Sequence, residues 1–265
     1  LSHTKQTKIW FRFKKNKFKE AIQILNQKSI EIDSILEDYY TLGFIKNLDF
    51  EKIFGNYHIF GEVQDLSSVK SIPAQFKPGE KLWDVCAGAG GKSLLIADRY
   101  NDTQIYASDI RSNIIENLKK RFQLAQIQIP IVFEHDGEKI IHKSSTSIHQ
   151  IIQSKNDGFN SILADVPCSG SGTWSRNPEF MASFSSEKII KYSEKQKQIV
   201  LNALPHLKKG GHLLYITCSV YNKENEYQVK FLIENSGLEL IEKNYLEGFE
   251  IGADTLFFAL FQKLK

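Results

Sequence analysis

The chain has 265 residues, of which 42% are hydrophobic and 25% are charged, and its formal net charge at pH 7 is +3. This length suits one large domain, or one domain with a small appendage, and the apolar content is sufficient for a sizeable core. No apolar run is long enough to cross a membrane, no signal peptide is visible, and the three cysteines show no disulfide or zinc-ligand spacing, so we expect a cytoplasmic protein without a metal site.

Residues 1–60 predict a small α+β unit with a basic edge. Its expected elements are a strand over 8–13, a helix over 18–27, and strands over 39–45 and 57–63. Basic and aromatic residues alternate over the first twenty positions, and this mixture suits contacts with a phosphate backbone and exposed bases. A solvated amphipathic edge would have the same composition. Because the chain begins at Leu1 and its only methionine is Met181, we expect further residues upstream.

From residue 79 the pattern alternates between strands and helices. Strands are expected over 81–86, 104–108, 130–134, 161–165, 212–217, 238–243 and 255–262. Helices are expected over 92–99, 112–123, 148–154, 186–207 and 224–234. This alternation predicts an α/β fold whose mostly parallel sheet is covered on both faces. A helix over 66–72, N-capped by Asp65, is expected before the sheet, a turn over 156–158, and a helix stop over 208–211.

Residues 84–93, Asp-Val-Cys-Ala-Gly-Ala-Gly-Gly-Lys-Ser, follow the first strand of this sheet and open a helix. Glycines let the backbone turn tightly and approach a ligand, and the helix N-terminus offers unpaired N–H groups to a carboxylate or a phosphate. The spacing is too short for a P-loop. Taken alone, this glycine loop is typical of a dinucleotide site, a nucleotide site or a plain turn.

The next two strands lead to Asp109 and Asp136. An acidic residue about twenty positions after the glycines commonly binds a ribose diol, and an acceptor after the following strand suits an adenine amino group. Each aspartate alone is typical of a cap or a turn. Together with Asp84 at the end of the first strand, these residues give three successive strands that lead to aspartates at one edge. This arrangement favours an adenosine-containing cofactor, either S-adenosylmethionine or NAD.

All three cysteines follow a strand of the sheet, at Cys86, Cys168 and Cys218. The fourth strand leads into Asp165-Val-Pro-Cys-Ser-Gly-Ser-Gly, and the fifth into Thr217-Cys-Ser. In open α/β sheets, ligands bind outside the carboxyl ends of the strands. A free cysteine is often a small buried hydrophobic residue, and we keep that interpretation for Cys86.

On these motifs the chain resembles the RNA cytosine-5 methyltransferases of the Sun and nucleolar-protein type. Four blocks agree in order and spacing: the glycine loop, the paired aspartates, the 165–172 block with its following Arg-Asn-Pro-Glu, and the Thr-Cys-Ser block with its following Glu-Asn-Glu. Residues 64–68 and 256–260 also resemble family segments, so the likeness covers nearly the whole chain. It implies a Rossmann-like S-adenosylmethionine-dependent methyltransferase sheet at 61–265, with a small RNA-binding subdomain at 1–60.

The resemblance implies roles for the residues of these motifs. Cys218 is the expected nucleophile that adds to carbon 6 of cytosine, and Cys168 is expected to assist the later release. Asp165 is expected to bind N3 and the amino group of the base, with a pKa that a dry pocket raises. The cation that lowers the pKa of Cys218 is expected to be Lys92, with Arg176 as the second choice.

The same resemblance implies a cofactor and a substrate. The cofactor is S-adenosylmethionine, with expected contacts at Cys86, Ala87, Gly88, Ala89, Gly90, Gly91, Lys92, Asp109, Asp136 and Asp165. The substrate is RNA, and the family favours ribosomal RNA, whose target base must leave any helix to be methylated. Contacts with RNA are expected at Arg12, Lys14, Lys15, Lys17 and Arg176.

Two positions depart from the family pattern. Gly88-Ala89 stands where Ala-Pro is common, which makes the loop more flexible, and Arg12-Phe13-Lys14 stands where Arg-Val-Asn is familiar. Two other functions are compatible with much of the sequence. DNA cytosine-5 methylation would use Cys168 as the nucleophile, and the Thr-Cys-Ser block disfavours it. A non-catalytic RNA-binding or ribosome-assembly protein would keep the fold, and the intact cysteines and Asp165 disfavour it.

Overall fold

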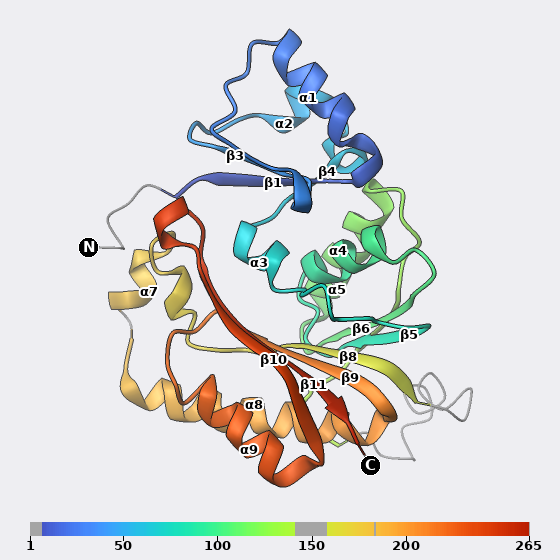
Figure 1. Ribbon diagram of the computed structural model, residues 1–265, viewed down its shortest axis with the longest axis vertical. Helices are drawn as coiled ribbons and strands as arrows, with labels where there is room; N and C mark the ends of the chain where they lie inside the picture. The colour runs from blue at the N-terminus through green and yellow to red at the C-terminus, as the bar shows by residue number, and fades with distance from the viewer. Residues whose placement is uncertain (1–6, 141–157, 183, 265) are drawn as a thin grey trace.

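The computed structural model describes residues 7–140, 158–182 and 184–264, which form two sheets with their helices (Figure 1). The N-terminal subdomain has a four-stranded antiparallel sheet in the order β2-β3-β1-β4. The larger part has a seven-stranded mixed sheet in the order β10-β11-β9-β8-β5-β6-β7. The predicted fold class, an α/β sheet with a small N-terminal subdomain, is confirmed.

The subdomain is built around aromatic side chains. Its elements are β1 (Ile9–Phe13), α1 (Phe18–Gln27), β2 (Ser34–Leu36), β3 (Thr41–Phe44), α2 (Phe50–Phe54) and β4 (Gly61–Val63). Its core is formed by Phe11, Phe13, Phe18, Ala21, Leu25, Leu42, Phe44 and Phe50. Trp10 is also buried, and its Nε1 donates a hydrogen bond to the carbonyl oxygen of Gly252. Two interpretations of the N-terminal mixture of basic and aromatic residues were left open, and its aromatic side chains are buried: Phe11, Phe13 and Phe18 belong to the core of the small sheet, and Trp10 packs with Leu66 and Ala253.

The large sheet has five parallel strands and an antiparallel edge. The parallel strands are β5 (Lys81–Asp84), β6 (Gln104–Asp109), β7 (Ile131–Glu134), β8 (Phe159–Asp165) and β9 (Leu207–Thr217). The antiparallel strands are β10 (Leu238–Glu247) and β11 (Thr255–Lys263). The chain leaves β5 toward β6 on one side and later returns to β8 on its other side. The strand order therefore reverses at β5, and α/β sheets bind ligands in the crevice that forms at the carboxyl ends of the strands at such a point.

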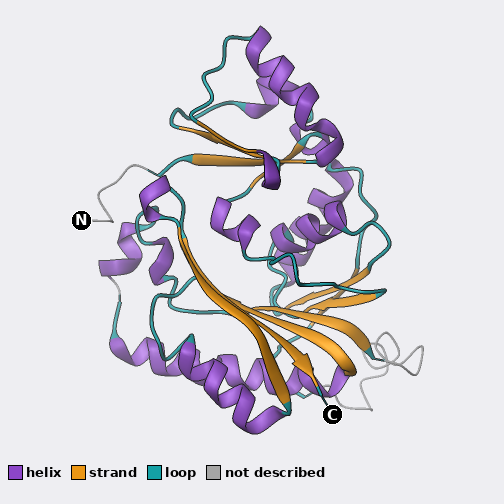
Figure 2. Ribbon diagram, in the orientation of Figure 1, coloured by secondary structure: helices purple, strands orange, loops and turns teal. Residues whose placement is uncertain are grey.

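Helices cover both faces of this sheet, as predicted (Figure 2). One face packs against α3 (Leu66–Lys70) and α4 (Gly91–Arg99), and α5 (Ser112–Leu124) packs beside α4. The other face packs against α8 (Ser186–Ala203) and α9 (Glu226–Ser236). Successive side chains of a strand point to opposite faces, which is why Leu163 joins the first core and its neighbours Ile162 and Ala164 join the second.

Several predicted boundaries differ from the structure. Residues 57–63 were expected to form one strand, but the N–H groups of Ile59 and Phe60 bond back to the carbonyls of Asn56 and Tyr57, so only β4 is a strand. Because β4 pairs with β1, the small sheet extends past residue 60. The predicted N-cap is confirmed, since Asp65 accepts hydrogen bonds from two backbone N–H groups of α3.

The segment between α8 and β9 also differs. The helix expected over 186–207 ends at Ala203, because Pro205 lacks the N–H that would continue it. Residues 208–211 do not stop a helix but bulge out of the pairing of β9 with β8, where Leu207 faces Phe159 and His212 faces Ser161. The helix expected over 148–154 and residues 156–157 of the expected turn lie outside the described residues. A short helix that the sequence did not predict, α7 (Pro178–Ala182), follows the 165–172 block.

No helix in the described part of the chain combines the length and the apolar character that crossing a membrane requires.

Candidate active site

The loops after β8 and β9 bring Cys168 and Cys218 together. Their Sγ atoms are 3.2 Å apart, and the backbone N–H of Cys218 donates to the Sγ of Cys168 at 3.3 Å. Both side chains are half-buried. The hydrogen bond with Cys218, together with burial, raises the pKa of Cys168 well above its usual value. Cys168 is therefore held as a neutral thiol beside the second sulfur.

One buried carboxylate, that of Glu224, joins the two cysteine loops. Its Oε1 accepts hydrogen bonds from the backbone N–H of Ser169 at 2.8 Å and from Nε2 of Gln196 at 3.1 Å. Its Oε2 accepts from Oγ of Ser219 at 2.5 Å. Sequence reasoning did not identify Glu224 as a site residue, although it begins the Glu-Asn-Glu block, because two of its donors, on Ser169 and Gln196, lie far from it in the chain.

Gly172 allows the same loops to approach the last strand. A Cβ at this position would lie 1.9 Å from the carbonyl oxygen of Thr255 and 3.2 Å from that of Cys218. Its N–H donates to the carbonyl of Cys218 at 2.9 Å. Any side chain here would push the loop that carries Cys168 away from β11 and would crowd the carbonyl of Cys218.

Lys92 and Asp165 form an ion pair beside the sulfurs. Nζ of Lys92 lies 2.6 Å from Oδ2 of Asp165, and their side chains are 11% and 35% exposed. Burial acts to lower the pKa of Lys92, but the carboxylate of Asp165 outweighs it, and nearby Cys218 adds to the rise. Lys92 thus keeps its positive charge close to the Cys218 thiol.

A cavity of about 550 Å³ connects the cysteines with the glycine loop. Its wall includes all the expected cofactor contacts except Gly90, namely Cys86, Ala87, Gly88, Ala89, Gly91, Lys92, Asp109, Asp136 and Asp165, together with Cys168 and Cys218. Gly90 has a φ of +80° and caps α4, and a Cβ there would lie 2.7 Å from Leu118 of α5. Burial raises the pKa of the Cys86 thiol, which suits the interpretation of Cys86 as an unreactive residue.

The polar groups of this cavity suit an adenosine cofactor that carries a carboxylate. Asp109 accepts a hydrogen bond from the N–H of Gly88 at 3.0 Å, and Arg111 binds both of its oxygens. Burial alone would raise the pKa of Asp109, but the hydrogen bonds from Arg111 outweigh burial and lower that pKa. Asp109 therefore remains an ionised acceptor for hydroxyl groups. The N-terminus of α4 opens onto the same space, where its N–H groups favour an anion.

Residues outside the four motif blocks also line the cavity. They include Val63, Gln64 and Ser68 before the sheet, Arg121 on α5, His135 after β7, and Lys195 and Ile199 on α8. The resemblance of residues 64–68 to a family segment was the one signal for Gln64 and Ser68. No local pattern indicates Arg121, because its place depends on the packing of α5 against the loop.

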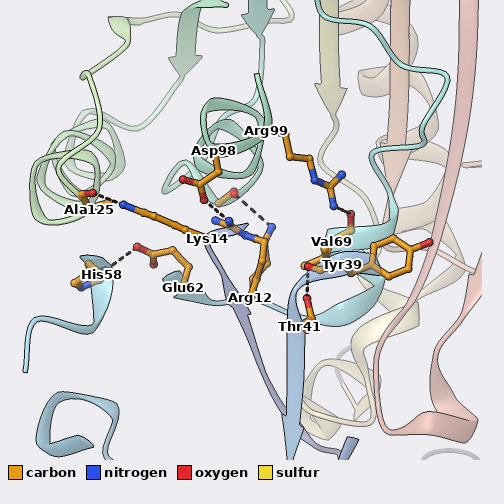
Figure 3. A network of polar contacts seen from close by, with 12 residues as sticks. Arg12, Lys14, Tyr39, Thr41, His58, Glu62, Val69, Asp98, Arg99 and Ala125 are labelled. Atoms are coloured by element: carbon orange, nitrogen blue, oxygen red, sulfur yellow. Dashed lines mark hydrogen bonds and ion pairs between the residues drawn. The ribbon is translucent and has the colours of Figure 1, made fainter. Parts of the chain in front are cut away.

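Two of the expected RNA contacts, Arg12 and Lys14, turn their charged ends toward the large domain (Figure 3). Arg12 is buried, pairs with Asp98 of α4, and donates from Nε to Gln64, so the expectation of a phosphate contact is wrong for Arg12. Lys14 also points inward, donating to the carbonyl of Ala125 at 2.6 Å, and burial lowers its pKa.

The remaining basic residues of that set are partly or fully exposed. Lys15 is exposed, and Lys17 is half-buried and pairs with Glu20. Arg176 is 44% exposed at its side chain and binds Asp254 through Nε and Nη2. Lys14 is half-buried like Lys17, and what separates it from these three residues is the inward hydrogen bond of its ammonium to the carbonyl of Ala125.

The large sheet with its glycine loop and rim of carboxylates is that of an α/β methyltransferase. Solved structures with this fold include a methyltransferase homologue from Pyrococcus horikoshii, with a TM-score of 0.78, 23% identity and coverage of 99% of this chain and 88% of that one. NSun6 from the same organism has a TM-score of 0.82 at 15% identity and covers 100% of this chain and 93% of its own.

Residues 73–260 match the family described as 16S rRNA methyltransferase RsmB/F. Ribosomal RNA small subunit methyltransferase B of Photorhabdus laumondii is 31% identical over 211 residues, which cover 76% of this chain and 46% of that protein. The 26S rRNA (cytosine-C(5))-methyltransferase nsun-1 of Caenorhabditis elegans is 30% identical over 209 residues, covering 77% and 29%. The chain belongs to the RsmB/F family of S-adenosylmethionine-dependent RNA cytosine-5 methyltransferases, as the motifs predicted. It spans less than half the length of these two relatives.

Proposed function

We propose that this protein methylates carbon 5 of a cytosine in ribosomal RNA through a covalent bond to Cys218. The observation that supports this most is the pair of sulfurs 3.2 Å apart on the wall of the cavity that also holds the glycine loop. Carbon 5 of cytosine is a weak nucleophile in the intact ring. A thiolate that adds to carbon 6 makes it an enamine carbon, which is a much better one.

In this proposal each residue has one task. Cys218 forms the bond to carbon 6, and Lys92 stabilises the thiolate with its charge. Asp165, paired with Lys92, faces the cavity and binds N3 and the amino group of the base. S-adenosylmethionine supplies, when bound, the electrophilic methyl group that carbon 5 takes up. A base then takes the proton of carbon 5, the electrons of that bond restore the double bond to carbon 6, and Cys218 leaves as a thiolate. Cys168 assists this release.

The family match favours the RNA-type assignment over DNA cytosine-5 methylation, because the matched family and the relatives at 30–31% identity are ribosomal RNA methyltransferases. In the DNA-type alternative, Cys168 would be the thiolate that attacks the base. The second alternative, an RNA-binding protein without catalysis, gives no reason for the ion pair of Lys92 and Asp165 beside two sulfurs.

The proposed RNA contacts leave out the two basic residues whose charged ends bind partners inside the protein. Lys15, Lys17 and Arg176 are the proposed RNA contacts, and Arg12 and Lys14 are left out because they point inward. The target base must be extruded from any helix to reach the cavity. The proposal includes a cytoplasmic location, where the thiols of Cys168 and Cys218 stay reduced.

Transfer of labelled methyl groups tests the proposal. The full-length protein is incubated with labelled S-adenosylmethionine and either ribosomal RNA, transfer RNA or DNA, and the labelled nucleoside is identified by mass spectrometry. We expect 5-methylcytosine in ribosomal RNA, and none with the Cys218→Ala variant although that variant still binds the cofactor. Label in DNA alone would favour the DNA alternative. Binding of RNA without any transfer would favour the non-catalytic one.

A further inference from the structure

The glycine loop is fixed from outside by two hydrogen bonds to its carbonyl groups. Nη1 of Arg121 donates to the carbonyl of Ala89 at 2.9 Å, and Nε2 of Gln64 donates to that of Gly91 at 3.3 Å. The loop itself contains Gly88 and Gly90, both with positive φ. Glycine backbones lose more conformational entropy on ordering than any others, so a loop of this composition depends on such contacts for its shape.

Arg121 is in turn held by the N-terminal subdomain. Its Nη2 lies 2.8 Å from Oε2 of Glu62, which belongs to β4. The side chain of Glu62 is 5% exposed and that of Arg121 25%, so this ion pair is shielded from solvent on the Glu62 side. The other oxygen of Glu62 lies 2.7 Å from Nδ1 of His58, and Figure 3 shows these two side chains facing each other beside Lys14.

The contacts form a continuous path from the small sheet to the cofactor cavity. It runs from β4 through Glu62 to Arg121 on α5, and from Arg121 to the backbone of the glycine loop. A charged donor that binds a carboxylate with one nitrogen and a carbonyl with another has little freedom to move. Among the described residues, Arg121 lines the cavity and Glu62 does not.

We propose that Glu62 is a positioning residue for the cofactor: it holds Arg121, which fixes the Ala89 carbonyl and with it the shape of the glycine loop. The proposal rests on the assignment of this cavity to S-adenosylmethionine, but not on the covalent mechanism. It makes the N-terminal subdomain part of the cofactor site, although none of the recognised motifs contains Glu62 or Arg121.

Calorimetric titration with S-adenosylmethionine tests this. We expect Glu62→Gln to weaken cofactor binding about tenfold, since it removes a charged partner from Arg121. Arg121→Gln should weaken it at least as much, and the double variant no more than Arg121→Gln alone, because both changes break the same path. The matched control is Glu116→Gln, which breaks an exposed pair with Lys119 on the same helix and should bind as the unchanged protein does.

Three results would overturn the proposal. They are unchanged affinity in Glu62→Gln, effects of the two substitutions that add in the double variant, and equal weakening in the control. Hydrogen exchange of residues 86–91 separates positioning from a general loss of fold: we expect faster exchange there in Glu62→Gln, with the strands of the large sheet still protected. Unchanged exchange of the loop would contradict the account.

A conservative variant covers the case in which Glu62→Gln does not fold. In Arg121→Lys the ammonium keeps a charge for Glu62 but has no second nitrogen for the Ala89 carbonyl, so binding should again weaken. Full affinity in Arg121→Lys would refute the proposal. Failure of RNA methylation with normal cofactor binding would instead count against the proposed function.

Discussion

Asp84 ends β5 at the base of the glycine loop and is 1% exposed. Its Oδ2 accepts a hydrogen bond from Oγ of Ser93 at 2.6 Å, whereas its Oδ1 has no hydrogen-bond partner within the described part of the chain. Burial raises the pKa of Asp84 to about 7. A carboxyl group that is neutral in the folded protein and ionised in the unfolded chain couples folding to pH.

The sign of this coupling gives a prediction. Between about pH 4 and pH 7 the folded state holds a proton on Asp84 that the unfolded state has lost, so the free energy of unfolding should fall as pH rises through this window. The stability that comes from the protonated Asp84 is fully present below about pH 4. Between about pH 4 and pH 7 it falls by at most about 1.4 kcal/mol for each pH unit.

Urea unfolding at several pH values checks it. Asp84→Asn should remove the slope and be more stable than the unchanged protein at pH 8, and the exposed Asp102→Asn serves as the control. A slope that survives in Asp84→Asn would show that other groups cause it.

At the scale of elements, β1 and α4 meet through a buried ion pair. Arg12 and Asp98 have side chains that are 3% and 9% exposed, and Arg12 also donates to Gln64. This contact attaches the N-terminal subdomain to the first helix of the large sheet. Removing one partner leaves a buried charge without compensation, which costs far more than an exposed pair is worth.

We therefore predict that Asp98→Ala lowers the free energy of unfolding by about 3–5 kcal/mol. Lys17→Gln, which breaks the exposed pair with Glu20, should cost about 0–1 kcal/mol. The double variant Arg12→Met with Asp98→Leu should recover most of the loss, because apolar residues pack in the same space. Chemical unfolding measures all three, and a stability of Asp98→Ala equal to that of the control would contradict the account.

The ion pair of Arg12 and Asp98 also shows which parts of the fold and of the site can be predicted from the sequence. The helix α1 was predicted with both its ends, because its apolar spacing through Ala21, Ile22 and Leu25 is a local signal. The strands of the large sheet and the cysteine loops were predicted because their motifs are contiguous. Arg12 was misinterpreted as an RNA contact, since its partner Asp98 lies 86 residues further along the chain. The same applies to Glu224 and Arg121, whose importance comes entirely from contacts between elements.

For the whole molecule, the N-terminal subdomain lies at the end opposite to α9 (Figure 1), and Lys15 belongs to it, in the short turn between β1 and α1 that forms its basic edge. If RNA binds along that edge, Lys15→Glu should lower RNA affinity and reduce the dependence of log K on log salt by about 1 for each phosphate that the protein no longer neutralises. Lys230→Glu on α9 introduces the same charge change at an exposed lysine far from that edge and should have a much smaller effect. Fluorescence anisotropy at several salt concentrations checks it, and equal losses of affinity for the two variants would count against a localised contact.

The central claim is that Cys218 bonds to the base and Cys168 releases it, and trapping of the protein–RNA adduct tests it most directly. The Cys168→Ala variant, incubated with RNA and S-adenosylmethionine and run on a denaturing gel, should accumulate a covalent complex. Cys218→Ala and the double variant should form none. An adduct in either of these two, or unimpaired turnover without any adduct in Cys168→Ala, would contradict the account.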